Sequence, residues 1–266
     1  MFRSARRLLR DAVARFLFPH GFYHFRRWDV SSLGAEPALV AMCLWNRPER
    51  FREILEQFAE QDLPGGVVLG LWNNNWQLKD YYEDVINEWR TTRQDGALGQ
   101  ILLAHSPANL GGVGRFYVAR RLARRFRQQY VMFLDDDQQI GPEFARVMLD
   151  QASPGHASSW WAWTVHNDDY WTRTRALPGD RVDYAGTGGM VIDAQILSSP
   201  DLFRSLPKEH WFLEDIWLNH IALSHGFSLG SVAVHIDFVM DETNQFHALA
   251  DQKPVFYRSL AERRRR

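Results

Sequence analysis

The chain has 266 residues, of which 45% are hydrophobic and 24% are charged, and its formal net charge is −1. These are ordinary values for a globular protein with a substantial core, and the balanced charge argues against bulk binding of nucleic acid. A single cysteine, Cys43, excludes an internal disulfide framework and fits a reducing compartment. No apolar stretch is long enough to cross a bilayer.

The N-terminal segment is basic and amphipathic. Residues 2–18 alternate arginine with leucine, valine, alanine and phenylalanine at helical spacing. Arginine and aspartate interrupt the apolar core that a secretory signal requires. We expect either a helix packed on the main domain with a solvated arginine face, or a peripheral helix attracted to an anionic membrane surface. The sequence therefore predicts a cytoplasmic protein, with the inner face of the membrane as a second location.

Apolar runs and amphipathic stripes alternate through the first half of the chain. The expected strands cover residues 39–45, 67–72, 101–104 and 130–134. The expected helices start at Arg47, where Asn46 is placed as the cap, and cover the stripe at 81–89 and residues 113–126. This alternation predicts an α/β fold with a mostly parallel central sheet flanked by helices, whose first half is a Rossmann-like nucleotide-binding unit.

The second half has a different pattern. It carries a tryptophan cluster, a glycine cluster at 186–189, a helix from about Glu214 and an expected strand at 228–238. Trp160, Trp161 and Trp163 alternate, so two of them should share a sheet face, where one can line an acceptor groove. The expected units are a basic extension (1–36), a domain (37–258) with a nucleotide-binding half (37–140) and an acceptor half (141–258), and a basic tail (259–266).

Three consecutive aspartates, Asp135, Asp136 and Asp137, follow the expected strand at 130–134. Like charges placed side by side repel one another unless a cation neutralises them or water solvates them. The strand would bring them to the carboxyl edge of the sheet, where open α/β folds bind ligands. A hard divalent cation that carries phosphate oxygens is the expected partner, and a solvated acidic turn is the alternative.

Polar residues also follow the other strands. Asn46 and Arg47 end the first expected strand, and residues 73–75 are three asparagines that end the second. Such amides suit a nucleobase or ribose, although asparagine is also common in turns. Asn109 begins a glycine-rich turn that runs into a helix at Arg115, a combination of backbone donors and a guanidinium that suits a diphosphate.

Glu214 and Asp215 lie in the first turn of an expected helix. Carboxylates there interact favourably with the helix dipole, and one of them can also remove a proton from an attacking hydroxyl. Two histidines follow, and either His235 or His247 can reach a metal or a phosphate. His235 lies in an expected strand, where a buried core role is the commoner one.

Together these motifs resemble those of GT-A type glycosyltransferases over roughly residues 39–258. In order, the markers are residues 45–47, 71–74, Asn109 with Arg115 and Phe116, 133–137, 184–189 and 213–219. Their order and spacing are similar to those of exostosin-like transferases, which move N-acetylhexosamine or related sugars from UDP donors. The family-two transferases share the aspartate and Glu-Asp motifs more loosely.

The resemblance implies a metal-dependent hexosyl- or N-acetylhexosaminyltransferase. Such an enzyme uses Mn²⁺ or Mg²⁺ and moves a sugar from a UDP-sugar to a hydroxyl of a glycan, lipid, peptide or small molecule. The implied donor-site residues are Asn46, Arg47, Asn73, Asn74, Asn109, Arg115, Asp135, Asp136, Gly188 and Gly189. The implied metal ligands are Asp137, Asp135 and His247, and the implied catalytic residues are Asp215 with Glu214 beside it.

Two alternatives stay open at the level of sequence. A haloacid-dehalogenase-type phosphatase also places aspartates after a buried strand, but it needs a downstream lysine and a second acidic pair, and this chain has only three lysines, Lys79, Lys208 and Lys253. A non-catalytic sugar-nucleotide-binding or scaffold protein is the other. His247 has no near arginine before Arg258, unlike the exostosin-like pattern, so inversion and retention both remain open.

Overall fold

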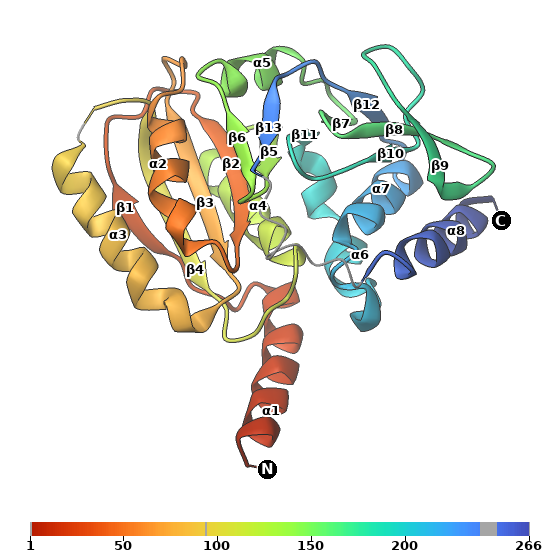
Figure 1. Cartoon of the computed structure of the whole chain (residues 1–266), viewed down its shortest axis with the longest axis horizontal. Coiled ribbons are helices and arrows are strands. Elements are labelled where there is room, and N and C mark those ends of the chain that lie inside the picture. Colours follow the sequence, from red (N-terminus) through yellow and green to blue (C-terminus); the bar gives the residue numbers. More distant parts are fainter. Residues whose placement is uncertain (1, 94, 240–248, 266) are drawn as a thin grey trace.

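The computed structural model describes residues 2–93, 95–239 and 249–265 (Figure 1). The strands are β1 (Arg26–Asp29), β2 (Ala38–Leu44), β3 (Val67–Asn73), β4 (Leu98–His105), β5 (Tyr130–Leu134), β6 (Gln138–Ile140), β7 (His156–Ser159), β8 (Ala162–His166), β9 (Asp169–Arg175), β10 (Tyr184–Ala185), β11 (Met190–Asp193), β12 (Ser228–Ser231) and β13 (Ile236–Phe238). The helices are α1 (Phe2–Leu17), α2 (Phe51–Ala59), α3 (Lys79–Thr92), α4 (Val113–Phe126), α5 (Phe144–Asp150), α6 (Pro200–Arg204), α7 (Glu214–Ser224) and α8 (Gln252–Arg265).

A large mixed sheet forms the centre of the molecule. In the described part of the chain, eight strands pair in the order β1-β4-β3-β2-β5-β11-β7-β12. The core strands β2, β3, β4 and β5 run parallel, whereas β1 and β11 pair with their neighbours antiparallel. Helices α2, α3 and α5 pack on one face, and α4, α6, α7 and α8 pack on the other. The predicted α/β fold, with a mostly parallel sheet between helices, is confirmed.

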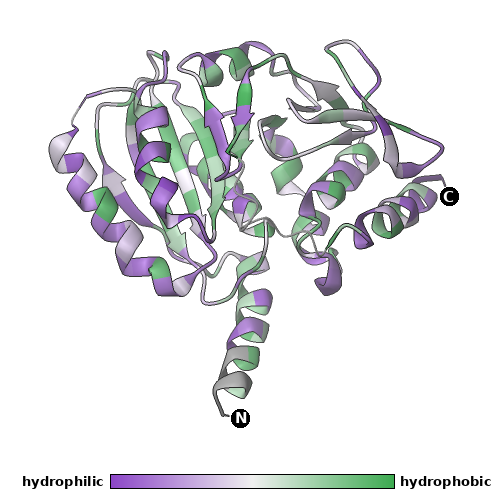
Figure 2. Cartoon of the chain, in the orientation of Figure 1, coloured by the Kyte–Doolittle hydropathy of each residue, from purple (hydrophilic) through white to green (hydrophobic). Residues whose placement is uncertain are grey.

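The central strands are apolar along their whole length because helices cover both of their faces. Every residue of β3 is buried, and all but one residue of β2 are. In Figure 2 these strands are mostly green, and hydrophilic colour is concentrated on the surrounding helices. The sheet therefore supplies a rigid platform, and function must come from the segments that leave its edges.

The strongest sequence patterns give correct boundaries. The predicted helix at 113–126 and strand at 130–134 are confirmed as α4 and β5. The prediction that Asn46 caps the first helix is wrong. A short 3-10 turn, η2 (Pro48–Arg50), precedes α2, and Asn46 makes no capping hydrogen bond there, because its side-chain oxygen accepts from Asn75 instead.

The prediction of one strand at 228–238 is also wrong. Its first part, β12, lies parallel to β7 at the edge of the large sheet, whereas its last part, β13, pairs antiparallel with β6. Because β7 has only four residues, it can pair with only a short strand, and the chain then crosses to β6. The third sheet of the described chain has the order β10-β8-β9.

The basic N-terminal extension contributes a strand to the sheet. β1 lies within residues 1–36 and pairs with β4, and the indole of Trp28 is buried beneath it. The sheet therefore begins before residue 37. At the other end of the chain, the basic tail from residue 259 continues helix α8.

Helix α1 projects away from the body of the molecule, towards the bottom of Figure 1. Ala14 and, after the helix, Phe18 are buried against the domain. The apolar stripe is not, because Leu8, Leu9, Val13 and Phe16 are 70%, 67%, 48% and 70% exposed. The expectation of a helix packed on the domain by its apolar face is therefore wrong. Within the described residues, no helix is long and apolar enough to span a membrane.

Candidate active site

The antiparallel strand β11 brings the two halves of the chain together at one edge of the sheet. Because β11 runs opposite to β5, its first residues lie beside the last residues of β5. The N–H of Gly189 donates to the carbonyl of Phe133 at 3.1 Å. A Cβ at Gly188 would lie only 2.7 Å from the Oδ2 atom of Asp135. The glycine cluster and the aspartates, 50 residues apart, therefore form one surface.

Each carboxylate of the trio faces a guanidinium. Arg47 donates to Asp136 at 2.6 Å and lies 3.4 Å from Asp137, and Arg115 lies 2.6 Å from Asp135. The side chain of Asp136 is nearly buried, whereas those of Asp135 and Asp137 retain 34% and 20% of their exposure. The alternative of a freely solvated acidic turn is therefore wrong, and two carboxylates remain accessible to a ligand.

The trio carries more negative charge than its arginines neutralise. Burial, and then the neighbouring Asp135, raise the pKa of Asp137 to about 6, although Arg47 favours its charged form. Burial also raises the pKa of Asp136. Raised acid pKa values mean that the site resists holding all of its negative charges at once. An additional positive group at this edge would relieve that repulsion.

Arg115 connects the trio to the Glu-Asp pair. Its guanidinium is buried and lies 3.7 Å from Glu214 as well as 2.6 Å from Asp135. Glu214 rests on the glycine-rich turn, because a Cβ at Gly112 would lie 1.5 Å from its carboxylate oxygen. Burial raises the pKa of Glu214 to about 7, against the pull of Arg115. Any larger residue at Gly112 would separate the turn from this carboxylate.

The asparagines support the site from behind. Asn73 is fully buried, and its amide contacts His105 at 3.0 Å and accepts from the N–H of Asn75. Asn74 holds the glycine-rich turn with two hydrogen bonds. Its amide nitrogen donates to the carbonyl of Gly111 at 2.9 Å, and its amide oxygen accepts from the backbone N–H of Leu110 at 3.0 Å. These two amides are occupied within the protein and fix the position of the turn.

The other donor-site asparagines lie nearer the surface. The side chain of Asn109 accepts from the N–H of Gly111 at 2.9 Å, which shapes the start of the turn. Asn46 is exposed and accepts from Asn75 at 3.4 Å. Of the polar groups expected at the donor, the arginines and carboxylates therefore lie together at the open edge, and the asparagine amides position the loops.

Asp215 is oriented by groups that sequence reasoning did not single out. The hydroxyl of Tyr184 donates to its Oδ2 atom, and the N–H of Ile216 donates to Oδ1 at 2.7 Å. Asn219 donates to the backbone of Asp215 and exchanges two hydrogen bonds with Ala185. Both residues lie within the 184–189 and 213–219 motifs, so the motifs themselves carried the signal.

Two further residues fix the trio. The buried guanidinium of Arg50 donates to the carbonyl of Asp136 at 2.9 Å, and Gln138 accepts from the N–H of Asp135 at 2.9 Å. Nothing in the sequence distinguishes Arg50 from a solvated arginine in the first turn of a helix. Its role depends on tertiary contacts that only the structure gives.

The two histidines have different outcomes. His235 is exposed and pairs with Asp237 at 3.0 Å, so the expectation of a buried core residue is wrong. His247 lies outside the described residues. Within the described part of the chain, no group of three or more histidine, cysteine, aspartate or glutamate side chains has the arrangement of a metal site.

The raised pKa of Glu214 predicts a pH dependence of stability. In the folded state this carboxyl binds its proton more tightly than in the unfolded chain, so its stabilising contribution is complete below pH 4.5 and lost as pH rises towards about 7. We expect the free energy of unfolding of Glu214→Gln to fall less than that of the wild type between pH 5 and pH 7.5, by on the order of a few kcal/mol. Urea denaturation at several pH values measures this difference, and parallel pH profiles would contradict it.

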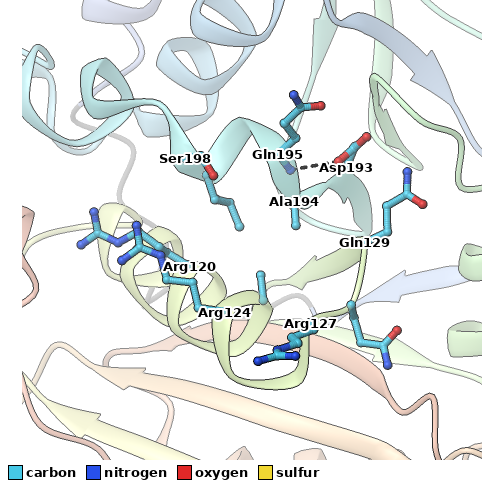
Figure 3. Close-up of a pocket in the computed structure, with 11 residues that line it drawn as sticks. Arg120, Arg124, Arg127, Gln129, Asp193, Ala194, Gln195 and Ser198 are labelled. Carbon is cyan, nitrogen blue, oxygen red and sulfur yellow. Dashed lines mark hydrogen bonds between the residues drawn. The ribbon is translucent and has the colours of Figure 1, made fainter.

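A separate hollow of about 270 Å³ lies at the opposite edge of the sheet (Figure 3). It is lined by Arg120 and Arg124 of α4, by Arg127 just after that helix, and by the end of β11 with the residues that follow it. Its carboxylate, Asp193, is already occupied by the N–H groups of Gln195 and Gly155. Because Gln129 precedes β5, whereas the acidic trio follows it, this hollow is not part of the candidate active site.

Comparisons with known proteins give a likeness of fold. No family model matches the chain, and no curated protein matches its sequence. A mannosyltransferase from Pyrobaculum calidifontis, solved with GDP-mannose and Mn²⁺, superposes with a TM-score of 0.50 at 13% identity, covering 86% of this chain and 64% of its own. TarS residues 1–349 of S. aureus, solved with UDP, gives 0.46 at 14% identity, covering 74% of this chain and 57% of its own. The chain thus shares the fold of the mannosyltransferase, and it spans less than two thirds of the length of either protein.

Proposed function

We propose that this protein is a metal-dependent glycosyltransferase that moves a sugar from a UDP-sugar to an acceptor hydroxyl. The observation that carries the proposal is the position of Arg115 at the start of α4. There its guanidinium joins Asp135, at the end of β5, to Glu214, at the start of α7. One cation thus links the two acidic motifs beside a glycine-rich helix start, an arrangement that favours binding of a diphosphate.

The residues present fit a divalent cation. Asp135 and Asp137 offer partly exposed carboxylate oxygens, the hard donors that Mn²⁺ and Mg²⁺ prefer. The raised pKa of Asp137, caused by burial and by Asp135, is the sign of charge that a cation would compensate. A bound divalent ion would supply charge neutralisation for the departing diphosphate. His247 completes the proposed ligand set.

The remaining residues have roles that follow from their positions. Arg115 and the backbone N–H groups at the start of α4 would stabilise negative charge on the diphosphate. Arg47, Asp135 and Asp136, with Gly188 and Gly189, would border the donor. Asp215, held by Tyr184, would accept the proton of the attacking hydroxyl. The sugar is a hexose or N-acetylhexosamine, in line with the resemblance to exostosin-like and family-two enzymes.

Isothermal calorimetry with UDP and GDP, each with and without Mn²⁺, tests this proposal. We expect UDP to bind at least tenfold more tightly with Mn²⁺ than without, and Asp137→Ala to remove that metal-linked gain. The exposed Asp95→Ala, which lies before β4 at the opposite end of the sheet, is the matched control and should keep it. A protein whose UDP affinity ignores Mn²⁺ would instead fit the phosphatase, and one that binds UDP yet never turns over a UDP-sugar would fit the scaffold.

We also propose that α1 contacts the anionic inner face of a membrane peripherally. Leu9, Val13 and Phe16 expose an apolar stripe on a helix that also carries exposed Arg10, the combination that binds at a lipid surface. The acceptor is then a glycan, lipid, peptide or small molecule reached from the cytoplasmic side.

Co-sedimentation with vesicles checks the membrane contact. The wild type should pellet with vesicles that contain phosphatidylserine, and much less with vesicles of phosphatidylcholine alone. Leu9→Glu with Phe16→Glu should release it, because charge on the apolar stripe opposes insertion while every arginine is kept. Ala5→Glu is not a suitable control because it alters the same helix; Val255→Glu, an exposed apolar residue on α8, is. Equal pelleting of both variants would contradict the contact.

A further inference from the structure

One face of the three-stranded sheet β10-β8-β9 carries alternating tryptophan and arginine. Arg175 lies directly opposite Trp163, and Trp163 lies opposite Tyr184, so these three side chains share a face. Arg173, two residues before Arg175 on β9, projects to the same face. We refer to Trp161, Trp163, Arg173 and Arg175 as the Trp–Arg face.

The two guanidiniums of this face lie against aromatic rings. The Cζ atom of Arg173 is 4.6 Å from the ring centre of Trp163 and 5.5 Å from that of Tyr184. The Cζ atom of Arg175 is 4.8 Å from the ring centre of Trp161 and 5.5 Å from that of Trp163. Such contacts hold a guanidinium plane in place and leave its N–H groups free to donate to a ligand.

No described carboxylate neutralises either arginine. Among the described residues, no carboxylate oxygen lies within 4 Å of either guanidinium, whereas the buried or half-buried Arg47, Arg50, Arg93 and Arg115 each have one. Arg175 donates instead to the carbonyl of Trp160. Burial lowers the pKa of Arg175, and no neighbouring carboxylate offsets it. The face thus holds two positive charges that no described acidic side chain pairs with.

Two polar atoms on this face have no hydrogen-bond partner in the described part of the chain. The Nη1 atom of Arg173 and the Nε1 atom of Trp163 are both buried and make no hydrogen bond with the described residues. Buried donors of this kind are rarely left unsatisfied, and a site that receives a ligand is one explanation for them. Both are donors, so the group that satisfies them must be an acceptor.

The Trp–Arg face ends at the candidate catalytic carboxylate. Tyr184, which contacts Arg173, donates its hydroxyl hydrogen bond to Asp215. Lys253 of α8 also faces this carboxylate. Burial opposes the charge of the Lys253 ammonium, but Asp215 favours it and raises the pKa of Lys253. The positive charge of Arg173 lies close enough to act in the opposite direction. A molecule lying on the face would therefore have its end at Asp215, where an attacking hydroxyl must be.

We infer that the Trp–Arg face is the acceptor subsite and that it takes a sugar carrying an anionic group, either a carboxylate or a phosphate. The indoles of Trp161 and Trp163 stack on the sugar ring, and Arg173 and Arg175 donate to the anionic oxygens. The inference rests on the proposed transfer reaction, since it places the acceptor hydroxyl beside Asp215. It goes further by specifying the charge of the acceptor.

Saturation-transfer NMR on the full chain tests the subsite directly. UDP is kept saturating, so that the donor site does not capture phosphates, and Mg²⁺ replaces Mn²⁺, whose paramagnetism would broaden the signals. The probes are methyl glucoside, methyl glucuronide and glucose 6-phosphate, which differ in charge but share a sugar ring. We expect at least one anionic probe to give a signal five times that of methyl glucoside or more.

The variants separate this face from general charge effects. Arg175→Gln should reduce the anionic signal severalfold, and Arg173→Gln with Arg175→Gln should reduce it to the level of methyl glucoside. Arg175→Lys, which keeps the charge, should retain part of it. The matched control is Arg181→Gln, because Arg181 is exposed just before β10 and already paired with Asp183. Thermal melting with each variant confirms that the fold is kept.

Three outcomes would overturn the inference. They are equal signals from the neutral and anionic probes, no signal from either anionic probe in a protein that binds UDP, and an anionic signal of wild-type strength in folded Arg175→Gln. Whether carboxylate or phosphate is the natural group follows from which anionic probe gives the stronger signal. Failure of UDP itself to bind would refute the proposed function instead, which is a separate observation in the same sample.

Discussion

Asp215→Asn is expected to lower the rate of sugar transfer by a factor of about 10² to 10⁴, the range lost when a general base is removed. The carboxamide has nearly the same shape, and its oxygen can still accept the hydrogen bond from Tyr184. UDP affinity should therefore change by less than about twofold, because Asp215 contacts the acceptor side. Turnover of a UDP-sugar, followed by release of UDP, measures the effect.

The exposed Asp95→Asn provides the control for this substitution, since it makes the same chemical change before β4, at the opposite end of the sheet from the site. Tyr184→Phe gives a second comparison, because it removes only the group that orients the carboxylate and should cost less than Asp215→Asn. Normal turnover in Asp215→Asn would remove this residue from the mechanism. Loss of UDP binding together with turnover would place it at the donor instead.

Arg115→Ala is expected to destabilise the folded protein by about 3 to 5 kcal/mol, the loss typical when one partner of a buried ion pair is removed. The substitution would leave Asp135 and the buried Glu214 facing each other without the cation between them. It should also weaken UDP binding, because the diphosphate would lose its guanidinium partner. Urea unfolding and calorimetry measure the two effects on the same sample.

Arg115→Lys separates charge from geometry. It keeps the positive charge but loses the planar fork, so an intermediate stability and a weaker hold on the diphosphate are expected. Arg121→Ala, on the exposed side of the same helix, is the control and should change the free energy of unfolding by less than about 0.5 kcal/mol. If Arg115→Ala proved as stable as Arg121→Ala, Arg115 would not be the link between the two acidic motifs.

The parts of the fold that sequence predicted well are those with continuous apolar pattern. β2, β3, α4 and β5 are long or fully buried, so hydrophobic burial alone specifies them. β1 was missed because three of its four residues are exposed, as suits an edge strand. The break within residues 228–238 has no proline to mark it, so only the lengths of the partner strands β7 and β6 explain it.

For the site, the sequence placed the acidic motifs, and the structure brought them together. The trio follows a buried strand and the Glu-Asp pair begins a helix, both of which are local patterns. Two arginine contacts depend on packing between distant elements. Arg115 contacts both acidic motifs, and the guanidinium of Arg50 donates to the backbone carbonyl of Asp136. The asparagines show the reverse case, since their pattern suggested ligand contact and their amides are occupied by the protein.

Because of the position of β11, the two halves of this molecule fold and unfold as one cooperative unit. β11 comes late in the chain, yet it forms the seam between β5 and β7 and pairs with both along its length. Opening that seam would leave one strand edge in each half without hydrogen-bond partners. It would also move away the Gly188 backbone against which the Asp135 side chain packs. Amino-acid changes in the acceptor half are thus constrained in β11, and they are tolerated more freely in the strands beyond it.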